Sequence, residues 1–262
     1  MINEGTTITI IEYSLATLAA IIAGFINALA GGGTLITFPV LLALGMPSIS
    51  ANVTNTVALC PGYLGGTLAQ SADLVDQKKR LLVLIPAGIA GGVVGGVLLL
   101  LTGDKLFTEL VPFLILLAST LLALQNPIRN WLNRRNGTQD EKQNLGFSFI
   151  SIFFASIYGG YFGAGLSVIL LAVLSLLLVD RLGRLNALKQ AIAFATNVAA
   201  ALFFFFSGHV FWLLAMFMAL GALLGGALGG RCANKIKPAI LKIMVVSIGY
   251  IIGIVYLINN LL

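Results

Sequence analysis

The residues of this chain that could do chemistry gather around two runs of small residues. Gly31–Gly33 interrupt the apolar stretch "FINALAGGGTLITFPV", and Gly163–Gly165 lie in a similar stretch, "GYFGAGLSVILL". Glycines between two apolar segments favour a broken helix, and we predict that helices restart at Thr34 and at about Leu166–Ser167. A restarted helix presents unpaired amides and the positive end of its dipole, so each break could bind an anion. Otherwise the glycines only permit close packing or a bent loop.

Polar side chains near the two breaks could complete such an anion site. Polar groups inside apolar segments are costly and are therefore functional candidates, although asparagines can also bond to neighbouring helices. Lys189, the charge deepest in register with an apolar segment, either supplies a positive charge or extends to the cytoplasmic face beside Arg181 and Arg184. The predicted binding residues are Asn27, Gly31, Gly32, Gly33, Thr34, Asn52, Thr54, Asn55, Gly163, Gly165, Ser167, Lys189, Gln190 and Asn197.

Other kinds of site have little support in the sequence. His209 stands alone, and Cys60 and Cys232 lie in different apolar segments without the spacing of metal ligands. The sequence holds no nucleotide-binding glycine loop, no metal motif and no nucleophile with a nearby base. We therefore predict a protein that is not an enzyme and that uses no cofactor and no metal. If such a protein moves a solute across a membrane, the energy would have to come from an ion gradient or from the solute's own gradient.

The elements that must position these residues are membrane helices. Of the 262 residues, 59% are hydrophobic and 9% are charged, which is typical of a polytopic membrane protein. The formal charge of +6 lies at segment ends and not on a basic and aromatic face, so we predict no nucleic acid partner. Apolar stretches of about 20 residues, the length of a membrane span, fall near 8–30, 50–70, 81–102, 106–125, 145–161, 163–179, 185–207, 210–230 and 238–258, with a shorter stretch near 34–45.

The two halves of the chain resemble each other. The glycines of "GIAGGVVGGV", which begin at Gly91, recur 134 residues later in "GALLGGALGG", and the two glycine breaks begin 132 residues apart. Such weak internal similarity is typical of transporter folds. The glycine face of each segment would let helix backbones approach closely, or alternatively would line a pore. The residues predicted to be structural are Pro39, Gly91, Gly95, Gly225 and Gly229.

The distribution of basic residues predicts that the two copies have opposite orientations. Lys78–Arg80 follow the 50–70 segment, but the equivalent place in the second half, Ser207–Trp212, carries no Lys or Arg. Conversely, the basic connection near Arg181 corresponds to the uncharged Gly45–Val53. Equivalent loops would therefore face opposite sides of the membrane. An inverted repeat needs an odd number of crossings per half, either five spans or a re-entrant hairpin plus three spans.

This arrangement divides the chain into three parts. We predict a first transmembrane repeat over residues 1–125, a cytoplasmic linker over 126–144 and a second transmembrane repeat over 145–262. The basic loops and the linker would be cytoplasmic, and both termini would be extracytoplasmic. The predicted fold class is an all-α polytopic membrane protein with two inverted repeats of about five helical segments each, with glycine-broken or re-entrant helices.

The residues around the breaks resemble a known family. "AGGGTLITFPVLLALGMPSISANVTNTVAL", Ala30–Leu59, is similar to the first signature of the TauE/SafE family of membrane transporters, which has a glycine run, Pro-x-Leu, a glycine and Ala-x-x-Thr-Asn. The second signature is matched by Lys189, Thr196–Asn197 and Gly208–Trp212. The resemblance covers nearly the whole chain. It implies an inner (plasma) membrane carrier that exports sulfite, sulfoacetate and related small organosulfur anions.

This chain departs from the family pattern at two places: many relatives have Asn where Ala193 stands, and the proline that they have near Leu171 is missing here. The departures imply that the second half of the binding site differs from that of these relatives. Our hypothesis is a secondary transporter that exports a small oxyanion by alternating access in the lipid bilayer, with H+ or Na+ as candidate coupling ions. The alternatives are an anion channel and a non-transporting membrane assembly partner. A cation carrier is disfavoured because no Asp or Glu lies deep within a span. Substrate identity, coupling ion and oligomeric state stay open.

Overall fold

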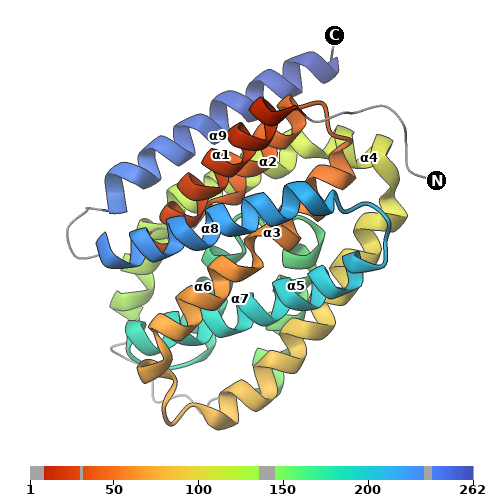
Figure 1. The fold of residues 1–262 in the computed structure, drawn as a ribbon. Coiled ribbons are helices and arrows are strands. Elements are labelled where there is room, and N and C mark those ends of the chain that lie inside the picture. The colour runs from red at the N-terminus through yellow and green to blue at the C-terminus, as the bar shows by residue number, and fades with distance from the viewer. Residues whose placement is uncertain (1–8, 30–31, 136–144, 233–237, 262) are drawn as a thin grey trace.

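Helices make up the regular structure of this protein. The computed structural model describes residues 9–29, 32–135, 145–232 and 238–261, and it holds no strand among them. The predicted all-α class is therefore confirmed, and Figure 1 shows the helices packed along one another as a bundle. The elements are α1 (Ile10–Leu29), α2 (Thr34–Ala43), α3 (Ser48–Ala69), the 3-10 helix η1 (Ser71–Leu74), α4 (Lys78–Arg135), α5 (Leu145–Tyr161), α6 (Leu166–Leu177), α7 (Leu182–Phe205), α8 (Trp212–Cys232) and α9 (Pro238–Leu261).

α4 consists of two helical arms joined at a kink. Gly103, with φ 75° and ψ 157°, interrupts the helical path between residues 78–102 and 104–135. Glycine adopts this positive φ readily because it has no Cβ. The two arms match the separate segments predicted near 81–102 and 106–125. The second arm continues to Arg135, so residues 126–135 of the expected linker are helical, and the rest of that linker lies outside the described residues.

Two helices are too short to cross a bilayer alone. α2 has 10 residues and α6 has 12, which at 1.5 Å per residue is about 15 and about 18 Å, against a hydrocarbon core of about 30 Å. By length and composition, α1, α4, α7, α8 and α9 each contain an apolar stretch that could cross the hydrocarbon core. Five full spans in each half are therefore excluded. The short helices occupy matching places in the two halves, while the inverted orientation of the halves stays a prediction.

Glycine faces bring two pairs of helices into backbone contact. A Cβ built on Gly225 of α8 would lie 1.9 Å from the carbonyl oxygen of Ile21 on α1, and one on Gly95 of α4 would lie 2.1 Å from that of Ile157 on α5. Such contacts are possible only without a Cβ, because small residues let helix backbones approach. Each pair joins the first helix of one half to the glycine-rich helix of the other. The other residues predicted to be structural are Gly91, which also faces α5, and the buried Gly229 and Pro39.

A polar cluster joins the two halves at the end of the bundle where Lys78, Lys79, Arg181 and Arg184 lie, called the basic end below. Asp180, in the connection between α6 and α7, accepts hydrogen bonds from Arg80 of α4 and, at 3.1 Å, from Arg184 of α7. Gln77 donates from Nε2 to the carbonyl oxygen of Arg184 at 3.0 Å. In Figure 1 this end lies opposite the start of α1 and the end of α9. Which side of the membrane each end faces stays a prediction.

The surroundings of Asp180 keep its carboxylate charged. Burial raises the pKa of a carboxyl group, but the hydrogen bonds from Arg80 and from the Arg181 amide, together with the charges of Arg80 and Arg184, outweigh burial here. They hold the pKa of Asp180 below its ordinary value. The charged form therefore stabilises the folded protein at neutral pH.

Replacing Asp180 with Asn should weaken this link between the halves. We expect Asp180→Asn to destabilise the protein by about 1–2 kcal/mol at pH 7, because a neutral amide holds two guanidinium groups poorly. Since the folded-state pKa is depressed, the contribution is complete above the ordinary carboxyl pKa of about 3.9 and is lost as the pH falls through the folded-state pKa. Thermal unfolding in detergent over this pH range measures it. The exposed Asp76→Asn is the control, and an equal effect there would contradict the assignment.

Candidate functional site

The first break brings the side chain of Asn27 against the restarted helix. The amide of Gly33 donates a 2.7 Å hydrogen bond to Oδ1 of Asn27, near the end of α1. A Cβ on Gly33 would lie 2.7 Å from Nδ2 of Asn27 and 2.6 Å from the carbonyl oxygen of Ala23, so glycine is required for this approach. α2 begins at Thr34, as predicted. Gly31, another predicted binding residue, lies outside the described residues.

The second break is held by a tyrosine at a closely matching position. Tyr158 donates from Oη to the carbonyl oxygen of Ala164 at 2.7 Å. This link and the Asn27 link each span six residues, and Tyr158 follows Asn27 by 131 positions. Both outer glycines of this break have φ 79°, and α6 restarts at Leu166, as predicted. The first break thus uses a side-chain acceptor for an amide, whereas the second uses a side-chain donor for a carbonyl.

The two breaks line one small cavity. Tyr63 of α3 and Leu122 of α4 complete its wall. The space open to the centre of a water molecule is about 10 Å³, which is close to what one water needs. Amide and hydroxyl groups from four elements therefore meet around one small space. The described lining residues are Asn27, Gly32, Thr34, Tyr63, Leu122, Gly163, Ala164, Gly165, Ser167 and Val168, and they include six of the predicted binding residues.

Two predicted asparagines of α3, Asn52 and Asn55, are not among the described lining residues of this cavity. Asn52 donates from Nδ2 to the carbonyl oxygen of Tyr161, the last residue of α5, at 2.9 Å. Asn55 is one helical turn further along α3 and is 1% exposed. The Oδ1 atoms of Asn52 and Asn55 have no hydrogen-bond partner among the described residues. Asn52 thus links α3 to the end of α5, just before the second break, and both asparagines keep an acceptor without a partner among the described residues.

Thr54 and Asn197 make hydrogen bonds to groups outside the small cavity in this conformation. Oγ1 of Thr54 accepts a 3.1 Å hydrogen bond from the amide of Phe211, in the connection between α7 and α8. Asn197 donates from Nδ2 to a carbonyl oxygen one turn back in α7, at 2.8 Å. Both side chains are buried, and neither is among the described lining residues of the cavity.

Lys189 belongs to a second polar cluster. Its side chain is buried, and Nζ donates to Oδ1 of Asn186 at 2.7 Å. Asn186 in turn donates to Oε1 of Gln70, which follows α3. Gln190 is partly buried at the next position of α7. Lys189 and Gln190 are not among the described lining residues of the cavity, so this conformation does not bring them to the two breaks.

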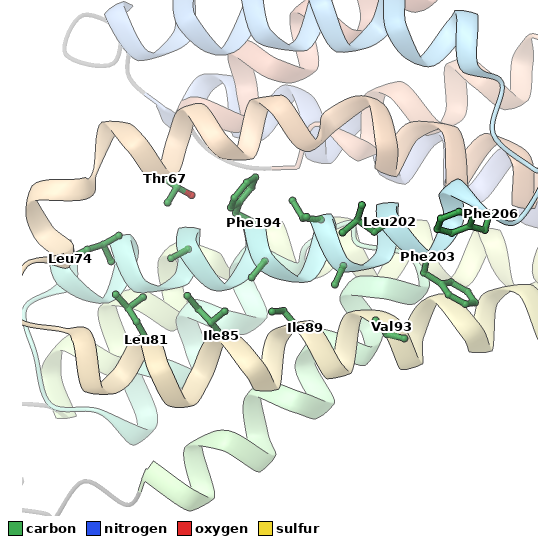
Figure 2. Close-up of a pocket in the computed structure, with 14 residues that line it drawn as sticks. Thr67, Leu74, Leu81, Ile85, Ile89, Val93, Phe194, Leu202, Phe203 and Phe206 are labelled. Carbon is green, nitrogen blue, oxygen red and sulfur yellow. The ribbon is translucent and has the colours of Figure 1, made fainter.

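A larger groove is apolar and is not suited to an anion. Figure 2 shows its lining side chains on α4, α7 and the end of α3, with Thr67, Ile85, Phe194 and Phe206 among them. Its volume, by the same measure as the small cavity, is about 780 Å³. Thr67 is the single polar residue among the described lining residues, so an anion would lose its hydration without gaining donors. In a bilayer, lipid tails would fill this groove.

Three residues of interest escaped the sequence reasoning. Tyr63 lines the cavity, Tyr158 holds the second break, and Lys242 of α9 is a buried cation with 7% of its surface exposed. Tyr158 follows Asn27 by 131 positions, close to the 132 positions that separate the two glycine breaks, and this spacing was the signal that could have identified it. Tyr63 lies among glycines in "PGYLGG", and Lys242 lies within the apolar segment 238–258. A polar or charged group inside an apolar segment is the signal that selected Lys189, and it applied equally to these residues.

Comparison with known proteins gives consistent results over almost the whole chain. The sequence profile of the family described as "Sulfite exporter TauE/SafE" matches residues 16–256. A "Probable membrane transporter protein" of Haemophilus influenzae is 29% identical over 232 residues, which cover 87% of this chain and 88% of that protein. "Probable membrane transporter protein ORF9" of Sinorhizobium sp is 27% identical, over 90% and 89% of the two chains. "Probable membrane transporter protein YunE" of Bacillus subtilis is 26% identical, over 91% and 96%. No solved structure gives a significant match.

Proposed function

Because the chain belongs to the sulfite exporter TauE/SafE family of membrane transporters, we propose that it is a secondary transporter that exports sulfite, sulfoacetate or a related small organosulfur anion. The observation that carries this proposal is the single cavity lined by both glycine breaks. Broken helices at corresponding positions of two halves mark the substrate site in many secondary transporters. The small anion would therefore bind where α1–α2 meets α5–α6.

The cavity offers hydrogen-bond donors that suit an oxyanion. Hydroxyl groups of Thr34, Tyr63 and Ser167 can each donate a hydrogen bond, and so can Nδ2 of Asn27. The starts of α2 and α6 add the positive ends of two helix dipoles. The amide of Gly33 is taken up by Asn27 in the described conformation. A turn of the Asn27 side chain would release this amide to the anion.

The cavity must widen before it can hold such a substrate. A volume of about 10 Å³ suits one water, whereas sulfite has a sulfur and three oxygen atoms. We therefore infer that the described conformation is closed, and that the two halves rock against each other to open the cavity to one side at a time. Thr54, Gln190 and Asn197 would then line the path to the cavity. Lys189 would supply a positive charge on that path.

The basic end of the bundle would face the cytoplasm of the cell. Lys78, Lys79, Arg181 and Arg184 gather where α3, α4, α6 and α7 end or begin, and cytoplasmic loops carry an excess of Lys and Arg. The start of α1 and the end of α9 lie at the other end of the bundle (Figure 1), so both termini would be extracytoplasmic. Tags at either terminus that react only after permeabilisation would overturn this topology.

Removing one hydroxyl from the cavity should slow transport. We expect the purified protein in liposomes to move sulfite or a small organosulfonate, and Thr34→Val to lower the initial flux about tenfold or more. Val keeps the shape of Thr but donates no hydrogen bond, and a hydrogen bond to a charged group contributes about 1.5–3 kcal/mol. Thr37→Val is the matched control, because its hydroxyl donates to the carbonyl oxygen of Gly33 at 3.2 Å within α2 and does not line the cavity.

Lys189→Ala tests the second part of the proposal. If Lys189 supplies a charge to the anion's path, its loss should lower the flux even though the residue is away from the closed cavity. Flux that neither Thr34→Val nor Lys189→Ala changes would contradict the proposed binding residues. Absence of flux for every small oxyanion tested would overturn the substrate class. Conductance far above carrier turnover would instead identify an anion channel.

A further inference from the structure

Two buried oxygen atoms on α3 are not part of the described lining of the small cavity. The Oδ1 atoms of Asn52 and Asn55 lack hydrogen-bond partners among the described residues, although the two residues are 0% and 1% exposed. Native proteins rarely retain such atoms, because a buried polar group without a partner is costly. A bound ligand that is present in only part of the working cycle is one physical reason to keep them.

The free atom of the Asn52 amide is its acceptor and not its donor. Nδ2 of Asn52 donates to the carbonyl oxygen of Tyr161 at 2.9 Å, and rotation of the amide would place Oδ1 against that second acceptor. The hydrogen bond therefore fixes which atom of Asn52 is free. Asn55 is three positions further along the helix, so the two Cβ atoms are about 5–6 Å apart on one face. Side chains at this spacing are neighbours, so one ligand between them could contact both.

A monovalent cation fits these acceptors better than an anion does. The side chain of Asn52 bonds to the last residue of α5, and the helix dipole is negative at that end. In transporters, such helix ends and neighbouring carbonyl oxygens coordinate the coupling ion. Both asparagines are neutral, whereas divalent cations in proteins are usually held by carboxylates. The described buried residues include no Asp, Glu or His that could carry a coupling proton.

We propose that Asn52 and Asn55 form a Na+ site that couples anion movement to the sodium gradient. The inference rests on the proposed function, since it supplies the ion that drives that transport. Tyr161, the link of Asn52 to the second break, precedes the cavity-lining Gly163 by two residues. The cation would lie close to the anion, and opposite charges attract strongly away from bulk water. Each ligand would therefore tighten the binding of the other by the same factor.

Sodium binding can be measured without any anion substrate. The purified protein in detergent is melted in NaCl and in KCl at equal ionic strength, because a ligand that binds the folded state raises the melting temperature. We expect Na+ to stabilise the wild-type protein, and Asn55→Ala to raise the half-saturating Na+ concentration at least about tenfold. Asn55→Ala leaves the Asn52–Tyr161 bond in place, and its melting in KCl shows that it folds. Ser119→Ala is the control, since this buried hydroxyl bonds within its own helix.

The outcomes separate the cation site from the proposed function. Melting of the wild-type protein that is identical in NaCl and KCl would overturn the Na+ site, whatever the anion flux. An unchanged sodium response in Asn55→Ala would overturn the assignment to Asn52 and Asn55. A sodium response that Asn55→Ala loses and Ser119→Ala keeps would support the site. If this response occurs in protein that moves no oxyanion in liposomes, the site stands and the proposed function fails.

Discussion

Gly225→Ala is expected to destabilise the folded protein by about 3 kcal/mol or more and to leave little of it in the membrane. The added Cβ would lie 1.9 Å from the carbonyl oxygen of Ile21 and 2.7 Å from its carbonyl carbon, whereas real Cβ atoms essentially never come within 3.0 Å of such atoms. Both atoms belong to the backbone of α1, so no side chain can turn away to relieve the clash. α1 and α8 would have to separate along their contact. The yield of folded protein and its melting temperature in detergent measure the effect.

Gly226→Ala provides the matched control on the same helix. The nearest atom to a Cβ at Gly226 is the carbonyl oxygen of Gly24, at an ordinary 3.9 Å. Since Ala favours helix over Gly by about 0.5–1 kcal/mol, this variant should be neutral or slightly more stable. Equal losses in Gly225→Ala and Gly226→Ala would contradict the close-packing role. A large loss at Gly225 alone would show that the position of the glycine, and not the glycine content of α8, matters.

The predicted helices agree with the structure because each depends on local composition. Apolar runs bounded by charges or glycines locate most of the described α-helices to within a few residues, including the restarts at Thr34 and Leu166, but they miss the extension of α4 to Arg135. The short stretch near 34–45 agrees with α2, but the length of α6 was harder to predict. The segment 163–179 reads as one apolar run, but the structure begins α6 at Leu166 and ends it at Leu177. Hydropathy does not distinguish an apolar turn from an apolar helix, so it cannot separate a half-span from a full one.

The site was predictable only where its signal is local. Asn27 is near the first glycine run in sequence, each run is recognisable from its own composition, and the structure places Asn27 and glycines of both runs on one cavity. Tyr63 joins that cavity only through the packing of α3 against the breaks. The position of Lys189 likewise depends on Asn186, whose partner Gln70 is 116 residues away. Such contacts come from tertiary packing, which hydrophobic periodicity does not encode.

Linking the two breaks covalently should stop transport. In a protein with Cys60→Ala and Cys232→Ala, we introduce Thr34→Cys and Ser167→Cys, which place one thiol on each side of the small cavity. The unlinked double-cysteine protein should itself transport more slowly, because it lacks two hydroxyl donors, and it is therefore the reference. A short thiol cross-linker should lower its sulfite flux to below about 1% of that reference value, and cleavage of the link should restore it. Alternating access requires the breaks to separate, and a covalent link resists far more than the about 5.5 kcal/mol that shifts a population from 1:99 to 99:1.

The two single-cysteine proteins control for modification alone. Each should keep measurable flux after treatment with a monofunctional reagent of similar size. If the reagent blocks the substrate by filling the cavity, the double-cysteine protein distinguishes this from locking, because cleavage of its link leaves the reagent remnants in place but frees the breaks to separate. Since Thr34 is 6% exposed and the cavity has room for about one water, a reagent can reach a thiol at position 34 only when the cavity opens, and so the rate of labelling there reports the opening. Linked protein that transports at the full rate would contradict separation of the breaks. Because a pore with a fixed path needs no such separation, that result would favour a channel over a carrier.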